Sequence, residues 1–433
     1  MKVLVLTTCY PRRSQPANGI FIHRQIRALA DLGVECHVLQ PVDWSPPPPI
    51  HLVDRAWQYD RLQRKDMLSE VEGIPVHHPA VYHPRPSRFF PGDYWERVGR
   101  SVSRYIERRP ALRSADLIYA HFLCHEGYAG LIASRRLGIP LVAIARGDDV
   151  HGWPARWPDR KPKLAAVLKE ADGLLACSRG LARDAQQWAT EGLARPFEVV
   201  YNGIDIDRFS PAESSEQKRA ARRSLGLPEE KRLLLSVATP IVAKGCFDLL
   251  DAFARISERV AGWDLVMAGS AHVDGLNLLN EAKARGLGSS VHWLGCLPPE
   301  TMPDLYRVVD AFVSASHNEG LSNSMMEAMA TGLPVVVTNV GGHAEIVGDG
   351  INGRLLPARD LDKLAAALRE VLTDHEKSAA LGRAARQRTL LIGNPQANAA
   401  HLLSYFREVL RGSKRLRSGC AVRCAVAASP HRR

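Results

Sequence analysis

Two glutamates stand eight residues apart, where a strand, a loop and a helix are expected to meet. Glu319 lies in the loop after the apolar run Asp310–Ser314, and Glu327 lies in a helical pattern that begins near Ser322. Serine is a good N-cap residue, and Gly332–Pro334 is expected to end the helix. A helix N-terminus presents free N–H groups and a positive dipole end to an anion, typically a phosphate. We therefore expect this segment to bind a phosphate-bearing ligand.

The elements around this segment alternate between strand and helix along the whole chain. In the first half, Lys2–Thr7 and Glu35–Gln40 read as strands, and apolar residues at helical spacing connect them up to Gly33. This alternation predicts an α/β fold with parallel sheets and helices on both faces, and ligands at the carboxyl ends of the strands. No Gly-x-Gly-x-x-Gly follows the first strand, which argues against a dinucleotide-binding dehydrogenase.

Length and composition describe an ordinary globular chain. Its 433 residues allow two or three domains, with 45% hydrophobic and 24% charged residues. There is no apolar run of transmembrane length, and the first residues are too short an apolar stretch for a signal peptide. The eight cysteines are scattered without a Cys-x-x-Cys pair, which suits reduced thiols. We expect a cytoplasmic protein.

The formal charge of +11 is distributed unevenly. Residues 411–433 hold seven Lys/Arg and no acid. A second basic cluster lies between residues 84 and 113, a segment with eight arginines and three acidic residues. Within it, Tyr94–Arg109 is compatible with a helix that has a basic face. Such a face can hold a protein to anionic lipid at the inner surface of a membrane. A solvated helix and a disordered tail explain the same charges. No aromatic or helix–turn–helix pattern accompanies them, so nucleic acid is not expected as a partner.

The segment around the two glutamates resembles the Glu-x7-Glu signature of family 4 retaining glycosyltransferases, which have the GT-B fold. The likeness continues through Gly332–Val336, Gly341–Val347 and Gly350–Leu356, and Val199–Phe209 resembles the inter-domain hinge of the family. The resemblance implies two Rossmann-like domains that face each other across a cleft, with a C-terminal helix crossing back to the first domain. It implies these bounds: an acceptor-binding domain at 1–205, a nucleotide-sugar-binding domain at 206–394 and the crossover helix at 395–411. The basic residues at 412–433 are expected to form a disordered tail.

In the second domain, the resemblance implies a role for each member of the donor site. Glu327 would bind the ribose hydroxyls and Glu319 the donor sugar. Lys244 would stabilise the leaving diphosphate, where negative charge builds as the sugar C–O bond breaks. Lys244 and Gly245 match a family loop, Gly-Arg-x-x-x-x-Lys-Gly, but Thr239 stands at the arginine position. The N–H groups after Gly320, near Leu321 and Ser322, would complete the anion site.

In the first domain, three residues are candidates. Gly19 resembles a glycine of the family loop that faces the donor phosphate, although a glycine that merely opens a helix reads the same. Arg146 stands where the family has a histidine that faces the donor sugar, and arginine cannot act as a base at neutral pH but can bind hydroxyls or a phosphate. His121 is either a substrate contact or a structural histidine. With His125 it has the spacing of a metal pair, but no third ligand stands out.

The reaction that these assignments imply is the transfer of a sugar from a nucleotide diphosphate sugar to an acceptor hydroxyl, with retention of configuration. The enzyme would be of hexosyltransferase type, with a saccharide or lipid-linked acceptor in polysaccharide or glycolipid biosynthesis. No cofactor or metal is expected, because Asp205-x-Asp207, the pattern closest to a metal motif, lies in the hinge element. Two alternatives are a nucleotide-sugar-binding protein with little catalysis, which the missing arginine favours, and a GT-B epimerase.

Overall fold

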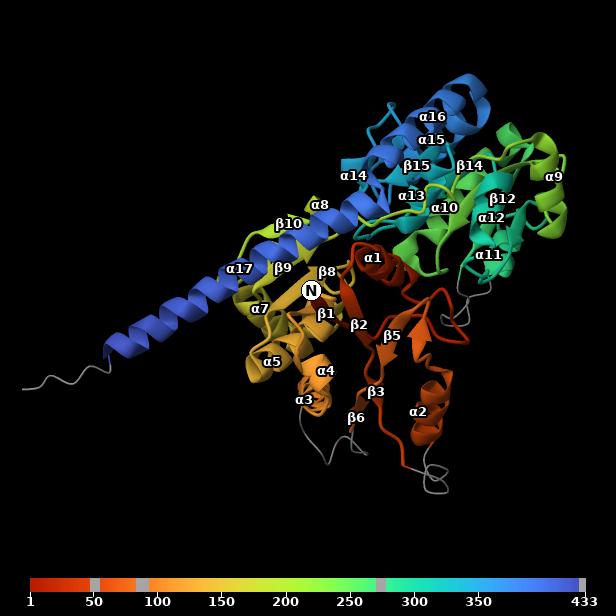
Figure 1. Cartoon of the computed structure of the whole chain (residues 1–433). Coiled ribbons are helices and arrows are strands. Elements are labelled where there is room, and N and C mark those ends of the chain that lie inside the picture. Colours follow the sequence, from red (N-terminus) through yellow and green to blue (C-terminus); the bar gives the residue numbers. More distant parts are fainter. Residues whose placement is uncertain (47–54, 83–92, 270–277, 428–433) are drawn as a thin grey trace, which may run out of the picture. The chain divides into compact units, whose positions relative to one another are not determined.

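The chain folds into two compact α/β units in the computed structural model, which describes residues 1–46, 55–82, 93–269 and 278–427 (Figure 1). Unit 1 comprises Met1–Cys177, Ala182–Val200 and Ala399–Arg433, and unit 2 comprises Ser178–Leu181 and Tyr201–Asn398. Each unit is built on its own mainly parallel sheet with helices packed against it. The predicted α/β fold with parallel sheets is therefore confirmed.

The sheet of unit 1 has eight strands, which are parallel throughout except for the β4–β5 pair. The central strands β7 and β8 are buried at every position and mostly apolar, as expected for parallel strands covered on both faces. In spatial order the strands are β10 (Phe197–Val199), β9 (Gly173–Ala176), β8 (Leu141–Ala145), β7 (Leu117–His121), β1 (Lys2–Leu6), β2 (Glu35–Leu39), β5 (Ile74–His77) and β4 (Glu70–Val71). A separate two-stranded ladder pairs β3 (Val42–Asp43) with β6 (Ala80–Val81).

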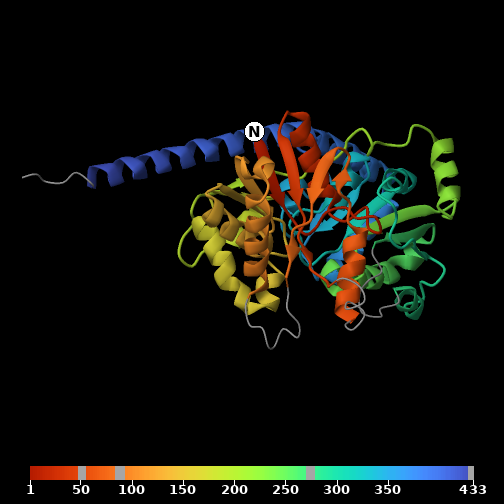
Figure 2. The same ribbon diagram turned by 60° about the horizontal axis from the view of Figure 1, so that its bottom comes forward.

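Helices cover both faces of this sheet, and α3 and α17 lie on opposite faces (Figure 2). On one face α3 packs closely on α5, because Gly99 has no side chain: a Cβ there would lie 2.7 Å from the Ala129 carbonyl oxygen. The helices in the first half of the chain are α1 (Ile20–Asp31), α2 (Arg55–Asp66), α3 (Tyr94–Glu107), α4 (Pro110–Arg113), α5 (Tyr128–Leu137), α6 (Trp153–Arg156), α7 (Lys161–Glu170) and α8 (Arg179–Gln186), with a π-helical turn, η3, at Leu123–Gly127 and a 3-10 turn, η4, at Pro158–Arg160.

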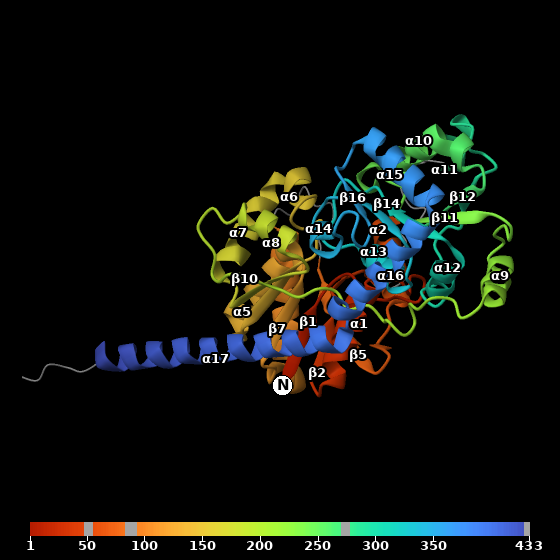
Figure 3. The ribbon, with the colours of Figure 1, turned by 90° about the horizontal axis from the view of Figure 1, so that it is seen from above.

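The last helix, α17 (Pro395–Ala427), carries the chain back to unit 1 and lies across its sheet near β1, β2 and β7 (Figure 3). Phe406 is fully buried there against Tyr119, with the two ring centroids 5.1 Å apart. The Tyr405 hydroxyl accepts a hydrogen bond of 3.0 Å from the amide of Leu174. The predicted crossover helix is confirmed by these contacts.

The end of this helix differs from the prediction of a disordered tail from residue 412. The helix continues to Ala427. Its added residues are mostly good helix formers such as Arg, Lys, Leu and Ala, and the first proline after them is Pro430. The Ser413 hydroxyl also donates to Asp172 at 2.7 Å, which fixes the helix beyond the predicted end at residue 411.

Unit 2 has a six-stranded parallel sheet in the order β13-β12-β11-β14-β15-β16. Its strands are β11 (Arg232–Val237), β12 (Trp263–Ala268), β13 (Val291–Trp293), β14 (Ala311–Ser314), β15 (Val335–Thr338) and β16 (Arg354–Leu356). Its helices are α9 (Ser215–Ser224), α10 (Cys246–Ile256), α11 (Leu278–Ala284), α12 (Met302–Val308), α13 (Asn323–Ala330), α14 (His343–Ile346), α15 (Leu361–Thr373) and α16 (His375–Ile392), with 3-10 turns η5 (Val242–Lys244) and η6 (Ser257–Val260).

The division between the units lies slightly earlier than the predicted boundary at residue 205. Tyr201–Asp205 belongs to unit 2, where the Ile204 amide donates to the Gly393 carbonyl at 2.8 Å and the Asn202 amide donates to Asn323 at 2.8 Å. A sequence pattern does not reveal contacts between residues that are far apart along the chain, so the predicted boundary differs by a few residues. Among the residues that the structure describes, no helix combines the length and apolar character needed to span a bilayer.

Candidate functional site

The candidate donor site of unit 2 is built on two loops that leave neighbouring parallel strands. β11 and β14 are paired in the sheet, so the loops that follow them emerge at the same edge. The first carries Lys244 in the turn η5, and the second carries Glu319 before α13. The loops are joined directly, because the His317 amide donates to the Ala243 carbonyl at 2.9 Å. Strands that are adjacent in space but distant in sequence thus bring the two charged residues together.

Lys244 and Glu319 form an ion pair. The Lys244 Nζ donates to Glu319 Oε1 at 2.8 Å, and the Ser316 hydroxyl donates to the same oxygen at 2.9 Å. The side chains are 30% and 15% exposed, so both reach solvent while held in place. The cation expected at the diphosphate and the carboxylate expected at the sugar therefore neutralise each other in the ligand-free protein.

Two glycines allow the backbones of this site to approach closely. Gly245 has φ of 63°, and a Cβ there would lie 1.9 Å from the Ala315 carbonyl oxygen. Gly341 has φ of 52°, and a Cβ there would lie 2.0 Å from the Glu319 carbonyl oxygen. Gly320 joins the same arrangement, since its carbonyl accepts from the Gly342 amide at 2.9 Å. Gly245 and Gly320, both predicted donor-site residues, thus hold the loops of Lys244 and Glu319.

The helix after Glu319 begins as predicted. Ser322 is the N-cap of α13, and its hydroxyl accepts from the Met325 amide at 3.2 Å. Leu321 and Ser322 are nearly buried, at 6% and 5% exposure. Glu327 lies in the second turn of α13 and is half-buried. The N-terminal end of α13 therefore directs its amide groups to the edge of the sheet where Lys244 and Glu319 meet.

Thr239 lies in the same exit loop as Lys244, directly after β11. It is half-buried, and its carbonyl accepts from the Ile241 amide at 2.8 Å. A threonine side chain carries no charge, so Lys244 is the cation that this loop supplies. The family loop that this segment resembles has an arginine at the position of Thr239 and a lysine at that of Lys244. The loop of this chain therefore has one positive charge where the family loop has two.

Sequence reasoning missed three residues that support this site. His317 Nε2 lies 2.7 Å from Asp248 Oδ2 on α10, which fixes the loop of Glu319 to that helix. The Ser178 hydroxyl donates to the Gly320 carbonyl at 3.0 Å. His343 is fully buried, with Nδ1 2.7 Å from the Thr338 carbonyl. Burial lowers the pKa of His343, and the nearby Glu319 carboxylate opposes that shift. The sequence offered a signal only for His343, which follows the Gly341-Gly342 pair.

Unit 1 brings together Arg146, which follows β8, and His121, the last residue of the neighbouring strand β7. The Arg146 guanidinium donates to His121 Nδ1 at 2.9 Å and to Gln25 Oε1 at 2.8 Å. It also lies over the Phe21 ring, 5.3 Å from its centroid. Arg146 is half-buried, so its charge is oriented by these partners while part of the side chain reaches solvent.

His121 is fully buried, which separates it from solvent. Burial lowers the pKa of His121 well below its usual value, and the Arg146 guanidinium adds to the shift. The imidazole is therefore neutral. Since Nδ1 accepts from Arg146, the proton resides on Nε2. This environment suits a residue that positions Arg146 better than one that itself contacts substrate.

Gly19 has a conformational role in unit 1. It is the N-cap of α1 with φ of 66°, and a Cβ there would lie 2.2 Å from the Cys9 carbonyl oxygen. Only glycine fits this position, because both the left-handed backbone and the close approach exclude a side chain. Gly19 thus opens α1 and sets the loop after β1.

A further acidic residue that the sequence did not single out lies beneath this loop. Glu126 is fully buried in the π-helical turn η3, and its Oε1 accepts from the Thr8 amide at 2.9 Å. Burial raises the pKa of Glu126 to about 7. The turn follows Phe122, which has an unusual φ of 72°. Strained backbone and π-turns are frequent at functional sites.

No group of three or more His, Cys, Asp or Glu residues in the described part of the chain is arranged to hold a metal ion. Of the predicted site residues, Gly19, His121 and Arg146 belong to unit 1. The others belong to unit 2, namely Thr239, Lys244, Gly245, Glu319, Gly320, Leu321, Ser322 and Glu327.

Comparisons with known families match both units. The family described as "Glycosyl transferases group 1" matches residues 217–388. The family described as "Glycosyltransferase Family 4" matches residues 19–208. The two matches together span most of both units, and the first contains Lys244, Glu319 and Glu327.

Two similar proteins come from bacteria. A D-inositol 3-phosphate glycosyltransferase of Xylanimonas cellulosilytica is 31% identical over 308 residues, which covers 68% of this chain and 73% of the relative. TuaC of Bacillus subtilis (strain 168), which carries the name of a teichuronic acid biosynthesis glycosyltransferase, is 28% identical over 379 residues, covering 87% of this chain and 89% of the relative.

Solved structures with the same fold cover nearly the whole chain. Anabaena Alr3699/HepE in complex with UDP and glucose has a TM-score of 0.71 at 20% identity, and covers 94% of this chain and 100% of that one. Sucrose-phosphate synthase from Thermosynechococcus elongatus has a TM-score of 0.74 at 19% identity, and covers 95% and 100%. These likenesses confirm the predicted GT-B fold class with its two Rossmann-like domains.

Proposed function

The chain belongs to glycosyltransferase family 4, and on this premise we propose that it transfers a sugar from a nucleotide diphosphate sugar with retention of anomeric configuration. The protein is a glycosyltransferase of glycan biosynthesis. The proposed acceptor is a saccharide or lipid-linked hydroxyl, in the assembly of a polysaccharide or glycolipid. The proposed location is the cytoplasm, with peripheral contact at the inner face of the membrane.

The observation that carries this proposal is the Lys244–Glu319 pair beside the N-terminal end of α13. The departing diphosphate needs positive charge where its own negative charge develops. Lys244 supplies a full charge, and the free N–H groups near Leu321 and Ser322 supply the helix-terminal partial charge. Glu319 then accepts hydrogen bonds from donor sugar hydroxyls, and Glu327 accepts them from the ribose.

The proposed reaction requires no metal. Lys244 and the α13 terminus neutralise the diphosphate directly. The residues of the site that could act as metal ligands, Glu319 and Glu327, are assigned to hydroxyl groups instead. Turnover that persists unchanged in an excess of chelator is the expected result, and loss of turnover that Mg²⁺ or Mn²⁺ restores would contradict this part of the proposal.

The test begins with a screen of nucleotide sugars and free nucleotides for thermal stabilisation of the purified protein. A ligand that binds only the folded state raises the unfolding temperature with concentration. The ligand found is then offered with saccharide and lipid-linked acceptors, and the anomeric configuration of the product is determined by NMR. An inverted product would refute retention, and stabilisation without any product would favour a binding protein.

Glu327 provides a sharper test of the donor site. Glu327→Ala should abolish transfer and weaken nucleotide-sugar binding, with the unfolding temperature of the free protein within a few degrees of the original. The matched control is Glu258→Ala, which removes an exposed glutamate from the same unit and should leave both properties unchanged. Near-normal turnover of the Glu327 variant would refute its assignment.

A further inference from the structure

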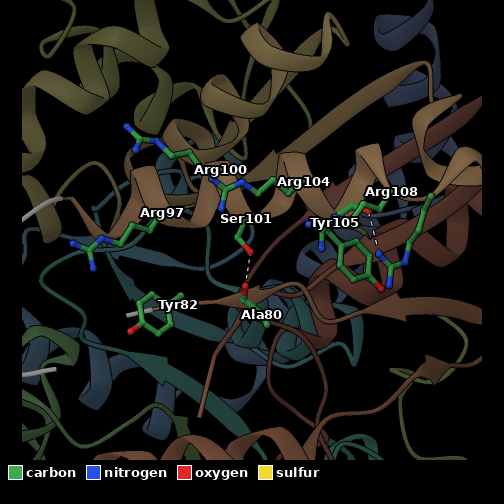
Figure 4. Close-up of a pocket in the computed structure, with 9 residues that line it drawn as sticks. Ala80, Tyr82, Arg97, Arg100, Ser101, Arg104, Tyr105 and Arg108 are labelled. Carbon is green, nitrogen blue, oxygen red and sulfur yellow. Dashed lines mark hydrogen bonds between the residues drawn. The ribbon is translucent and has the colours of Figure 1, made fainter. Parts of the chain in front are cut away.

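Arginines of α3 and of the two residues that follow it, together the α3 arginines, line a cavity of about 540 Å³ in unit 1 (Figure 4). α3 is amphipathic: one face, with Val98, Val102 and Ile106, is buried in the unit. The opposite face lines the cavity together with β6. The Ser101 hydroxyl on this face donates a hydrogen bond to the Ala80 carbonyl of β6. The cavity is lined by Ala80, Tyr82, Arg97, Arg100, Ser101, Arg104, Tyr105, Arg108 and Arg109.

The described lining of this cavity is strongly basic. Among the residues that the structure describes there, five are arginines and none is an aspartate or glutamate. Glu96, on the neighbouring turn, pairs with Arg100 at 3.0 Å. Glu107 pairs with Arg136 at 2.7 Å and also lies within electrostatic reach of Arg104. Like charges at helical spacing repel one another, so an anionic ligand is the partner that would stabilise this row.

The shape of the row indicates a surface of many phosphates more than a single small anion. From Arg97 to Arg108 the helix advances by roughly 16 Å at 1.5 Å per residue. Arg100, Arg104, Arg108 and Arg109 are exposed, and only Arg97 is half-buried. A pocket for one phosphate would gather several donors around one point, whereas these guanidinium groups are spread along the length of the helix (Figure 4).

An exposed aromatic pair lies beside the arginines. Trp44 and Tyr82 are 36% and 62% exposed, and their ring centroids are 5.5 Å apart. They follow β3 and β6, the two strands of the small ladder next to α3. Tryptophan and tyrosine have an apolar body and a polar tip, which suits the boundary between lipid headgroups and acyl chains. Inorganic phosphate and pyrophosphate would gain little from such a pair.

We propose that this face of unit 1, formed by the α3 arginines with Trp44 and Tyr82, binds the phosphate groups of anionic phospholipids. Guanidinium groups form bidentate hydrogen bonds with phosphate oxygens, and the aromatic pair inserts at the interface. The inference deepens the peripheral location proposed above by naming its ligand and residues. It places the membrane against α3, β3 and β6.

The experiment measures co-sedimentation of the full-length protein with vesicles of phosphatidylcholine, alone or mixed with phosphatidylglycerol. No sugar donor is present, so its outcome is independent of the transfer reaction. We expect binding to the anionic vesicles only, weakened by salt because the charges are exposed. The triple variant Arg100→Gln, Arg104→Gln, Arg108→Gln should partition roughly tenfold or more weakly, since each basic residue near the surface contributes to binding. The basic C-terminal residues are unchanged in this variant, and we expect them to account for the vesicle binding that remains.

The matched control removes three exposed arginines from unit 2, with Arg219→Gln, Arg259→Gln and Arg383→Gln. It lowers the net charge equally and should keep most vesicle binding. Equal loss in both triple variants would overturn the proposal, because net charge alone would then explain binding. Calorimetry with inorganic pyrophosphate is the second arm. Tight pyrophosphate binding that the α3 variant loses, without vesicle binding by the original protein, would overturn the membrane assignment in favour of a soluble phosphate ligand.

Discussion

At the scale of single residues, the Lys244–Glu319 ion pair links two roles of the donor site. In the ligand-free protein, the Lys244 ammonium forms an ion pair with the Glu319 carboxylate, with an N–O distance of 2.8 Å. A bound diphosphate competes for the same ammonium. The ammonium has three N–H donors, but a bound diphosphate and the Glu319 carboxylate repel each other, so donor binding is expected to displace Glu319 toward the sugar. The two residues act as one unit, whose members respond in opposite ways to substitution.

This coupling predicts opposite effects on nucleoside diphosphate binding. Lys244→Ala should weaken that binding roughly tenfold or more, because it removes the cation and leaves Glu319 unpaired beside the anion. Glu319→Gln should bind nucleoside diphosphate as tightly as the original protein or several-fold more tightly, because the competing charge is gone. Both variants should lose transfer.

Calorimetry with a nucleoside diphosphate and a product assay with the full donor measure the two effects. Gln retains the size of Glu and an acceptor for the Ser316 hydroxyl, so the variant isolates the charge. Lys283→Ala, in α11 of the same unit, is a control that should change neither property. Weakened diphosphate binding by Glu319→Gln would contradict the competition between carboxylate and phosphate.

The sequence predicted the members of this pair but not their contact. Lys244 and Glu319 were found because each lies in a recognisable loop, and their separation of 75 positions gave no indication of direct bonding. That contact depends on the β11–β14 pairing, which is a property of the sheet order. Ser178 and His317 were missed for the same reason, since serine and histidine are common in loops and only their spatial neighbours reveal a role.

At the scale of elements, the π-helical turn η3 of unit 1 contains a buried carboxyl group whose ionised form is unfavourable. Glu126 is fully buried, burial raises its pKa to about 7, and nearby Asp149 adds to that shift. The amides of Leu123, Arg146 and Gly147 donate to Asp149 at 2.7, 3.0 and 2.8 Å, respectively, which fixes the turn against the loop after β8. The turn thus holds a carboxyl group that is protonated over a range where an exposed glutamate is ionised.

The pH dependence of stability follows from this shift. In the unfolded chain Glu126 has a pKa of about 4.3, lower than in the folded protein. Between the two values only the unfolded state ionises, so the folded state loses stability as pH rises toward about 7. Glu126→Gln mimics the protonated acid and does not titrate. Its stability relative to the original protein should rise with pH, by on the order of 3 kcal/mol at pH 8.

Urea unfolding at a series of pH values from about 5 to about 8 measures the free energy of unfolding of the Glu126 variant and of the original protein. Each unit by which the folded pKa exceeds the unfolded pKa adds about 1.4 kcal/mol to the difference between them at high pH. Glu408→Gln, on the exposed side of α17, is the matched control for removing one carboxylate. A difference between the Glu126 variant and the original protein that stays constant, or that falls with pH, would show that the carboxyl is not buried in protonated form.

The elements themselves were largely predictable, and their exceptions have local causes. The strands β14 and β15 and the start of α13 follow from apolar runs, an N-cap serine and the Gly332 stop. The turn η3 was not predicted, because a π-turn depends on an inserted residue that spacing alone does not reveal. The end of α17 was misplaced because charge was read as disorder, although the charged residues there are also helix formers.

At the scale of the whole molecule, unit 1 combines segments from the first and the last parts of the described chain. The first strand β1 lies at the centre of the sheet, between β7 and β2, and α17 adds its apolar residues to the core on one face of that sheet. Val3, Val5 and Tyr119 share this core with Leu402, Phe406 and Val409. Unit 1 is therefore incomplete until the last part of the chain is in place, whereas the main segment of unit 2, Tyr201–Asn398, is continuous in sequence.

Phe406→Ala tests this dependence, because it leaves a cavity where α17 meets β7. Loss of a buried phenylalanine costs about 3–5 kcal/mol, and the cost should be confined to unit 1. Hydrogen exchange with mass spectrometry should show faster exchange in β1, β7 and β8 and unchanged exchange in β11 and β14. Arg407→Ala, the exposed neighbour on the same helix, should leave both sheets protected. Equal loss of protection in both sheets would mean that α17 stabilises the chain as one cooperative body, and unchanged exchange in β1 and β7 would mean that unit 1 completes its core without it.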